Sequence, residues 1–141
     1  MVLALTRNEM AVIAHTVLLE AEDQAFHGKL AVAFVIKNRM EKSHKSAYDI
    51  CWAPWQFSCW LENLDKIGKR MTNAPGEMVQ DSWKAVELAI TESVSDPTQG
   101  ATHYLNIEVT KQQRGDGKLP SWVEAMEHTV TIGAHDFYKE K

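Results

Sequence analysis

The chain has 141 residues, of which 45% are hydrophobic and 24% are charged, so we expect one globular domain spanning residues 1–141. The formal net charge of −4 and the absence of a basic run argue against nucleic acid as a partner. The two cysteines are too few for a disulfide framework. The apolar start, Met1–Leu5, is too short for a signal peptide or a membrane span. We therefore expect a monomer that does not insert into a membrane.

The first third of the chain predicts two helices. Thr6 is followed three residues later by Glu9, which is the signature of a capping box, and the apolar residues that follow recur at helical spacing. The first helix should run from Arg7 to about Glu22. The second should run from about Phe26 to Glu41, with a broad apolar face. Gly28 lies in its first turns, where close packing against the first helix would explain a glycine.

The middle of the chain predicts shorter helices around an aromatic cluster. We expect a short helix at 47–50, another at 61–69, a polar turn at 70–76, and a third long helix over 77–95, ended by Asp96-Pro97. Pro54 forbids a regular helix through the aromatic segment. The cluster consists of Trp52, Trp55, Phe57 and Trp60, and Trp83 in the later helix is expected in the core.

The last third of the chain differs from the helical part before it and predicts β-structure. Residues 101–109 alternate and are prone to form a strand, and residues 110–120 form a polar loop with two glycines. A second strand is expected at 128–132, with further β-structure at Phe137-Tyr138 beyond a break at Gly133. These elements favour an antiparallel hairpin or a three-stranded sheet. The fold class is therefore α+β, mainly α, with a small antiparallel sheet in the C-terminal half.

Glu20 is the candidate catalytic acid. It stands near the end of the first apolar helix, shortly before the second begins at Phe26. A carboxyl group at a junction between two buried helices can be partly desolvated, which raises its pKa and keeps it protonated, as a general acid requires. The alternative is an ordinary solvated glutamate, because glutamates are rarely buried.

Several neutral polar and aromatic residues could bind a sugar. Amide, hydroxyl and imidazole groups can meet ring hydroxyls, while flat aromatic faces cover the apolar C–H faces of the ring. For Gln56 and Asn106 the alternative is bonding to the local backbone, and for His103 it is a structural role in a strand. The candidate substrate-binding residues are Gln56, Ser58, His103, Tyr104, Asn106, Trp122 and His135.

Two competing chemistries have weak support. The six histidines are scattered, and no HExxH, CxxC or His-x-His spacing indicates a metal site, so no metal or other cofactor is expected. A cysteine protease built on Cys51 or Cys59 with His103 is conceivable. Cys59, however, lies in an apolar aromatic sequence, which raises a thiol pKa and makes the thiol inert.

Five separated blocks of the sequence resemble the cell-wall hydrolases related to the spore-cortex-lytic enzyme of germinating endospores. They occur in the family's order and together cover about nine-tenths of the chain. The blocks are Ile13-Ala14 through Glu20-Ala21 with Gly28-Lys29-Leu30-Ala31-Val32-Ala33 and Val35-Ile36-Lys37-Asn38-Arg39; Gln56-Phe57-Ser58; Asp96-Pro97-Thr98-Gln99-Gly100-Ala101-Thr102-His103-Tyr104; Pro120-Ser121-Trp122; and Ile132-Gly133-Ala134-His135-Asp136-Phe137-Tyr138.

The resemblance implies a compact, mostly helical fold distantly like lysozyme, and cleavage of peptidoglycan between N-acetylmuramic acid and N-acetylglucosamine. It also implies that Glu20 is the catalytic glutamate. The chain departs from the family at Gln24, where relatives often carry a second acid. Glu22 and Asp23 lie nearby but replace small residues.

One carboxyl group is sufficient for a lytic transglycosylase, because the C6 hydroxyl of the same muramic acid is a tethered nucleophile. A hydrolytic muramidase would need a second acid at about 5 to 9.5 Å. The candidates for that acid are Asp96 and Asp136, and Asp96 before Pro97 fits a helix stop better. We therefore expect a lytic transglycosylase, with hydrolysis as the close alternative.

The biological role predicted from these observations is that of a phage endolysin. A catalytic domain without a signal peptide or a wall-binding repeat would stay in the host cytoplasm until a membrane lesion releases it to the periplasm and cell wall. Two alternatives remain from other classes, a metal-dependent amidase and a non-enzymatic glycan-binding module. The amidase would lose activity with a chelator and leave glycan strands intact, whereas the binding module would lose nothing on Glu20→Gln.

Overall fold

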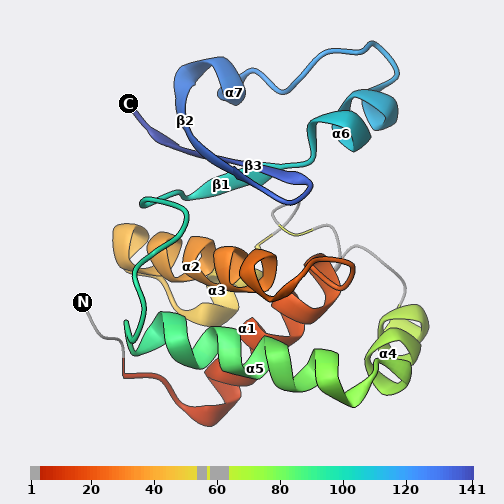
Figure 1. The fold of residues 1–141 in the computed structure, drawn as a ribbon, viewed down its shortest axis with the longest axis vertical. Helices are drawn as coiled ribbons and strands as arrows, with labels where there is room; N and C mark the ends of the chain where they lie inside the picture. The colour runs from red at the N-terminus through yellow and green to blue at the C-terminus, as the bar shows by residue number, and fades with distance from the viewer. Residues whose placement is uncertain (1–3, 54–56, 58–63) are drawn as a thin grey trace.

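The computed structural model describes residues 4–53, 57 and 64–141. Figure 1 shows a layer of helices, α1 to α5, beneath a small sheet that carries α6 and α7. This arrangement confirms the α+β, mainly α, prediction. The elements in chain order are α1 (Arg7–Glu20), α2 (Phe26–Ser43), α3 (Ala47–Cys51), α4 (Leu64–Asn73), α5 (Gly76–Ile90), β1 (His103–Leu105), α6 (Ile107–Arg114), α7 (Trp122–Ala125), β2 (Met126–Ile132) and β3 (His135–Glu140).

Helix α1 begins at the predicted capping box. The hydroxyl of Thr6 accepts a hydrogen bond from the backbone N–H of Glu9 at 3.2 Å, and the Glu9 carboxylate accepts one from the backbone N–H of Thr6 at 3.2 Å. The helix ends at Glu20, two residues before the predicted end at Glu22. The candidate acid is therefore the last residue of the helix.

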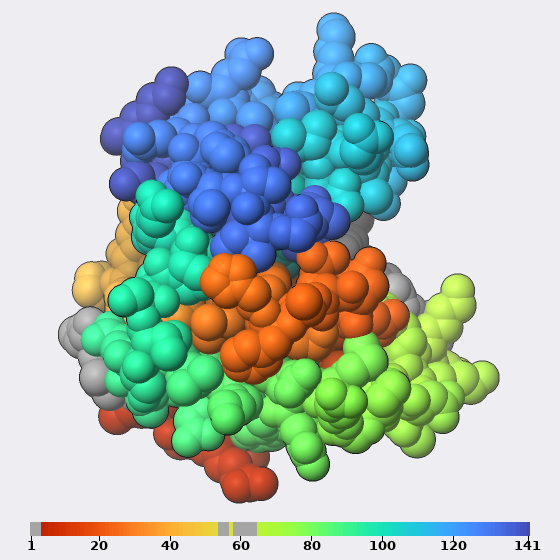
Figure 2. Space-filling model, in the orientation of Figure 1, coloured from red at the N-terminus to blue at the C-terminus, as the bar shows by residue number. Residues whose placement is uncertain are grey.

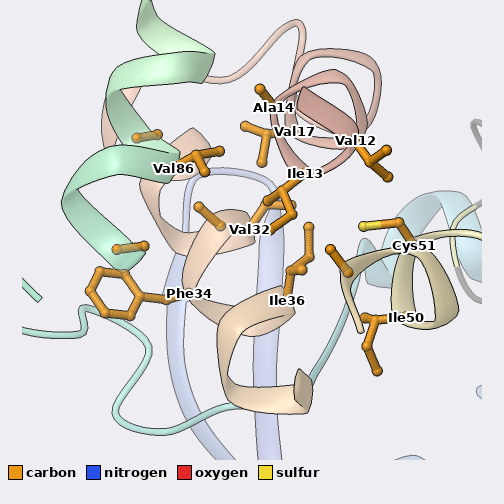
Figure 3. Close-up of a cluster of buried hydrophobic side chains, with 14 of the residues drawn as sticks. Val12, Ile13, Ala14, Val17, Val32, Phe34, Ile36, Ile50, Cys51 and Val86 are labelled. Carbon is orange, nitrogen blue, oxygen red and sulfur yellow. The ribbon is translucent and has the colours of Figure 1, made fainter. Parts of the chain in front are cut away.

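Helix α2 is the centre of the molecule. Ten consecutive residues, Gly28 to Lys37, are buried, so the helix is covered on all sides and not on one broad face as expected. Figure 3 shows Val32 and Ile36 of α2 beside Ile13 of α1 and Val86 of α5. The opposite side of α2 supports the sheet, where Val35 packs with Phe137 of β3.

Gly28 is required by a close contact, but the partner differs from the expected one. A Cβ atom at this position would lie 2.8 Å from the Cβ atom of Gln24, closer than real side chains approach. Gln24 belongs to the turn between α1 and α2, not to α1 itself. The glycine therefore lets this turn fold back tightly against the start of α2.

The boundaries of α4 and α5 differ from the prediction. Helix α4 continues to Asn73, through most of the predicted polar turn, and α5 starts directly after Pro75. Helix α5 ends at Ile90 because Glu92 adopts a left-handed conformation, with φ of 55°. Trp83 packs against the core as expected but is only half-buried, and the guanidinium of Arg7 lies 5.6 Å from the centre of its ring.

The sheet is antiparallel, with strand order β1-β3-β2, which agrees with the three-stranded option. His103 of β1 and His128 of β2 both pair with Tyr138 of β3. Strand β1 is shorter than the predicted 101–109, because the side chain of Asn106 caps a helix there. The polar loop predicted at 110–120 is therefore partly helical, and α7 was not predicted.

Asp96 ties the start of the sheet to helix α2. One carboxylate oxygen accepts hydrogen bonds from the backbone N–H and the hydroxyl of Thr98, at 2.8 and 2.7 Å. The other accepts from the side chain of Asn38 and the backbone N–H of Gly100, each at 2.9 Å. Asp96, which was predicted to end a helix, thus accepts the four hydrogen bonds that hold the turn leading into β1.

We predict that Asp96→Ala lowers the free energy of unfolding by about 2–4 kcal/mol, because four donors lose a charged acceptor. Chemical denaturation of the purified variant measures this loss. Asp116→Ala is the matched control, because this exposed aspartate accepts a hydrogen bond from the backbone N–H of Lys118 in a similar turn and otherwise forms an exposed ion pair with Arg114 at 3.8 Å. An Asp96→Ala variant as stable as this control would contradict the assignment.

Candidate active site

Glu20 continues a buried face of α1. Residues three, four and seven positions earlier lie on the same side of a helix, and here these are Val17, Thr16 and Ile13, all buried. Glu20 itself is half-buried. Its carboxyl group is therefore directed along the edge of the core and is not surrounded by bulk solvent.

Two cations from other helices cap the end of α1. The guanidinium of Arg70 in α4 donates to the carbonyl of Leu19 at 2.9 Å, and the ammonium of Lys29 in α2 donates to the carbonyl of Ala21 at 2.9 Å. The last turn of α1 contains no basic residue of its own. Positive charge at a helix C-terminus satisfies unpaired carbonyls and the helix dipole, so these contacts fix the backbone on both sides of Glu20.

Lys29 also closes the turn after Glu20. Its ammonium donates a second hydrogen bond to the carbonyl of Gln24, at 2.6 Å, although the residue is only 3% exposed. Burial lowers the pKa of Lys29, and the nearby carboxylates of Asp81, Asp23 and Glu22 act against that shift.

Gln24 joins this turn to the sheet. Its side-chain oxygen accepts a hydrogen bond from the backbone N–H of Ala134 at 3.3 Å, in the turn between β2 and β3. Gly133, with φ of 57°, permits this approach, because a Cβ atom there would overlap the same oxygen. Figure 1 shows the β2–β3 turn above the segment that follows α1. Gln24 therefore connects the two layers.

Arg39 of α2 lies near Glu20 in the fold. Burial lowers the pKa of its guanidinium, and Tyr104, Cys51 and Glu20 act against that shift. The Nε atom donates to the backbone carbonyl of Thr102, and the guanidinium lies 5.1 Å from the centre of the Phe57 ring. Arg39 thus places a half-buried positive charge near the candidate acid and holds the start of β1.

Tyr104 and His135 lie on the face of the sheet that is directed toward α2. The two rings are 4.9 Å apart in an edge-to-face arrangement, and Tyr104 also packs on Phe137 at 5.6 Å. Burial lowers the pKa of His135, so the imidazole is neutral at pH 7. Its Nδ1 atom is buried and has no hydrogen-bond partner among the described residues. Both residues belong to the same neighbourhood as Arg39.

His103 and Trp122 lie on the other face of the sheet. Neighbouring residues of a strand point to opposite faces, so His103 is separated from Tyr104. Its ring packs on Trp122 at 5.1 Å, and Trp122 packs on Tyr138 at 5.5 Å. His103 nevertheless lies on the edge strand and lines a cavity together with Arg39. Burial lowers its pKa as well.

Three predicted binding residues remain, namely Gln56, Ser58 and Asn106. Gln56 and Ser58 lie outside the described residues. Asn106 is described, and its side-chain oxygen accepts a hydrogen bond from the backbone N–H of Val109 at 3.0 Å, as the N-cap of α6. This contact is the local backbone bonding that was the alternative to a role in sugar binding.

The two candidates for a second acid are both engaged in the fold. Asp96 accepts the four hydrogen bonds described above. Asp136 accepts from the imidazole of His128 at 2.9 Å and from the hydroxyl of Thr131 at 2.5 Å. Both partners lie on strand β2, so Asp136 is held against the neighbouring strand.

The described part of the chain offers little for thiol or metal chemistry. Cys51 is a buried free thiol, and burial raises its pKa to about 11, so it is protonated and unreactive at neutral pH. No three histidine, cysteine or acidic side chains of the described residues lie together in a way that could hold a metal ion. Among the same residues, no helix is both long and apolar enough to span a bilayer.

Sequence reasoning missed the residues that hold the site together. Lys29 and Arg39 stood within recognised blocks, but no role was predicted for either, and Arg70 was placed in a polar turn. A basic residue inside an otherwise apolar helical run was the available signal for Lys29 and Arg39. Arg70 contacts Leu19, which lies 51 positions earlier in the sequence, so no local pattern could indicate its role.

Two solved structures are similar to this chain. The catalytic domain of the Bacillus cereus SleB protein has 25% identity and a TM-score of 0.71, covering 96% of this chain and 93% of that one. The catalytic domain of the germination-specific lytic transglycosylase SleB from Bacillus anthracis has 25% identity and a TM-score of 0.70, covering 96% and 98%. The search of curated proteins found no match.

The family comparison covers most of the chain. The model of the Cell Wall Hydrolase family matches residues 23–138, a segment that starts just after Glu20 and includes α2, the sheet and every other predicted site residue. The structural similarity extends over α1 as well, since it covers 96% of the chain. The chain belongs to the Cell Wall Hydrolase family.

Proposed function

We propose that this protein is a lytic transglycosylase that cleaves the glycan strand of peptidoglycan between N-acetylmuramic acid and N-acetylglucosamine, with Glu20 as its single catalytic acid. The observation that carries the proposal is the position of Glu20, half-buried at the end of α1 that Lys29 and Arg70 cap. Membership of the Cell Wall Hydrolase family supports the substrate class, and the similarity to a germination-specific lytic transglycosylase supports the reaction.

The proposed reaction uses one carboxyl group twice. Protonated Glu20 donates its proton to the glycosidic oxygen as the bond from that oxygen to C1 of N-acetylmuramic acid breaks. The resulting carboxylate accepts the proton of the C6 hydroxyl of the same sugar, and the C6 oxygen bonds to C1 to close a 1,6-anhydro ring. The guanidinium of Arg39 stabilises the carboxylate between the two steps.

The engagement of Asp96 and Asp136 favours this mechanism over hydrolysis. A hydrolase needs a second carboxylate that is available to activate water or to form a covalent intermediate. Both candidates instead accept hydrogen bonds within the fold. An intramolecular hydroxyl removes the need for that second group.

Glu20→Gln should reduce the release of soluble fragments from purified peptidoglycan by at least about 10²-fold, because the amide cannot donate or accept the catalytic proton. Glu87→Gln makes the same chemical change on the exposed side of α5 and should leave the rate unchanged. Mass spectrometry of the fragments from the unmodified protein should show 1,6-anhydro-muramic ends. Reducing ends would establish a muramidase instead, and undiminished cleavage by Glu20→Gln would exclude Glu20 as the acid.

Lys29→Met should lower kcat by about tenfold with a smaller change in KM, because loss of the ammonium releases the carbonyls that fix the backbone after Glu20. Lys37→Met is the matched control. Lys37 is also a lysine of α2 that is 3% exposed, but its ammonium pairs with Glu41 and Glu92, away from the end of α1. Both variants should lose stability, and only Lys29→Met should lose turnover. Equal losses of kcat would mean that Lys29 acts on stability alone.

The proposed biological role is that of a phage endolysin held in the host cytoplasm until the inner membrane is breached. Bacteria that produce the chain without an added export signal should grow normally and lyse only after the inner membrane is permeabilised. Turbidity before and after permeabilisation measures this. Lysis without permeabilisation would contradict the role, as would survival after it.

A further inference from the structure

Trp52 is a large aromatic residue that lies exposed at the surface. It follows α3 directly, and 53% of its surface is accessible. Its ring lies 5.3 Å from the ring of Tyr48, one turn earlier, with an angle of 36° between the planes. The two aromatic side chains thus form a neighbouring pair at the surface of the helical layer.

Charged groups border this aromatic pair. A hollow of about 430 Å³ is lined by Tyr48 and Trp52 together with Lys45, Asp49 and Ala53. Within the described part of the chain, neither Lys45 nor Asp49 forms an ion pair. The hollow therefore combines flat apolar surfaces with a donor and an acceptor that the fold does not use.

The hollow continues toward the candidate active site. A second cavity of about 310 Å³ shares Lys45, Asp49 and Ala53 with it and extends between α2, α3 and the edge of the sheet, to Arg39 and His103. His103 is one of the predicted substrate-binding residues, and it lines this cavity. Both volumes lie within the range of about 300–1,000 Å³ that is usual for ligand sites. Together the two cavities run from Trp52 to Arg39 and His103.

The charges along this path are mixed. Arg39, Lys42 and Lys45 are balanced in part by Asp49 and Glu140, and Lys42 pairs with Glu140 at 2.6 Å. A strongly basic groove would select a polyanion, and an apolar groove would select a protein segment or lipid. Alternating charges beside aromatic faces fit a ligand with many uncharged hydroxyl and amide groups and apolar C–H faces, which is the chemistry of an N-acetylated sugar.

We propose that Trp52 and Tyr48 form a remote saccharide subsite, which holds a sugar of the glycan strand while the scissile bond lies at Glu20. The proposal rests on the proposed function, because it takes the same strand to be the substrate. The aromatic faces stack on the pyranose ring, and Lys45 and Asp49 bond its hydroxyl or amide groups. The subsite contributes to binding of long strands and not to the chemical step.

The test measures binding apart from cleavage. In a Glu20→Gln background, Trp52→Ala should bind sedimented peptidoglycan about tenfold more weakly, as expected from the loss of a stacked aromatic face. Trp52→Phe should restore most of the affinity. Val94→Ala, which truncates another exposed apolar residue, 38% accessible, should bind as the parent does. Circular dichroism confirms that each variant is folded.

A second measurement uses the catalytically intact chain. Trp52→Ala should raise KM about tenfold for long glycan strands with little change in kcat, and it should leave the cleavage of strands too short to reach from Glu20 to Trp52 unchanged. Unchanged binding in the sedimentation assay would overturn the subsite, whatever reaction Glu20 performs. Equal losses on short and long strands would overturn it as well. Weaker binding by Trp52→Ala together with cleavage that survives Glu20→Gln would support the subsite and refute the proposed mechanism.

Discussion

The capping of α1 by cations from elsewhere in the chain is the interaction on which the site depends. A helix C-terminus leaves carbonyl groups without partners, and the last turn of α1 supplies no basic residue of its own. Lys29 from α2 and Arg70 from α4 fill that role. Burying a lysine is unfavourable unless its ammonium is well bonded, so the cost of placing Lys29 in the core is offset by its contacts with the carbonyls of Ala21 and Gln24. The backbone that carries Glu20 is thereby fixed by three helices.

The sheet is positioned relative to Glu20 by neighbouring residues of the same helix. Asn38 donates to Asp96 and to the carbonyl of Ala101, each at 2.9 Å, and Arg39 donates to the carbonyl of Thr102. These bonds hold the segment that leads into β1 against α2. At the other end of the sheet, Gln24 contacts the β2–β3 turn. The two layers are therefore joined at both sides of the candidate site.

In the space-filling view, the outline of the molecule is indented between α6 and α4, and the segment after Glu20 borders that indentation (Figure 2).

Local patterns predicted the parts of this structure that local forces determine. The capping box of Thr6 and Glu9 predicted the start of α1, and the break predicted at Gly133 is the turn between β2 and β3. Helix α6 was missed because Ile107, Val109 and Thr110 are β-branched and favour a strand, whereas the cap at Asn106 and the stop at Gly115 outweigh that preference. The candidate acid could be found from its place in a family block. Lys29, Arg39 and Arg70 could not be assigned roles, since each acts on a backbone group or side chain that only the tertiary fold brings near.

Glutamine at residue 24, where the resemblance implies that relatives often carry a second acid, is consistent with chemistry that needs one carboxyl group. An amide oxygen at this position accepts the hydrogen bond from Ala134 without adding a negative charge. A carboxylate there could accept the same bond, but it would add to the charge of Glu22 and Asp23, two acidic residues that already lie in this turn. Repulsion between neighbouring carboxylates would favour protonation of one of them, and a protonated acid is a weaker acceptor for the hairpin. Glutamine therefore keeps the connection between the layers independent of pH, provided that no step of the reaction requires a base at residue 24. A transglycosylase that uses the C6 hydroxyl of its own substrate satisfies that condition.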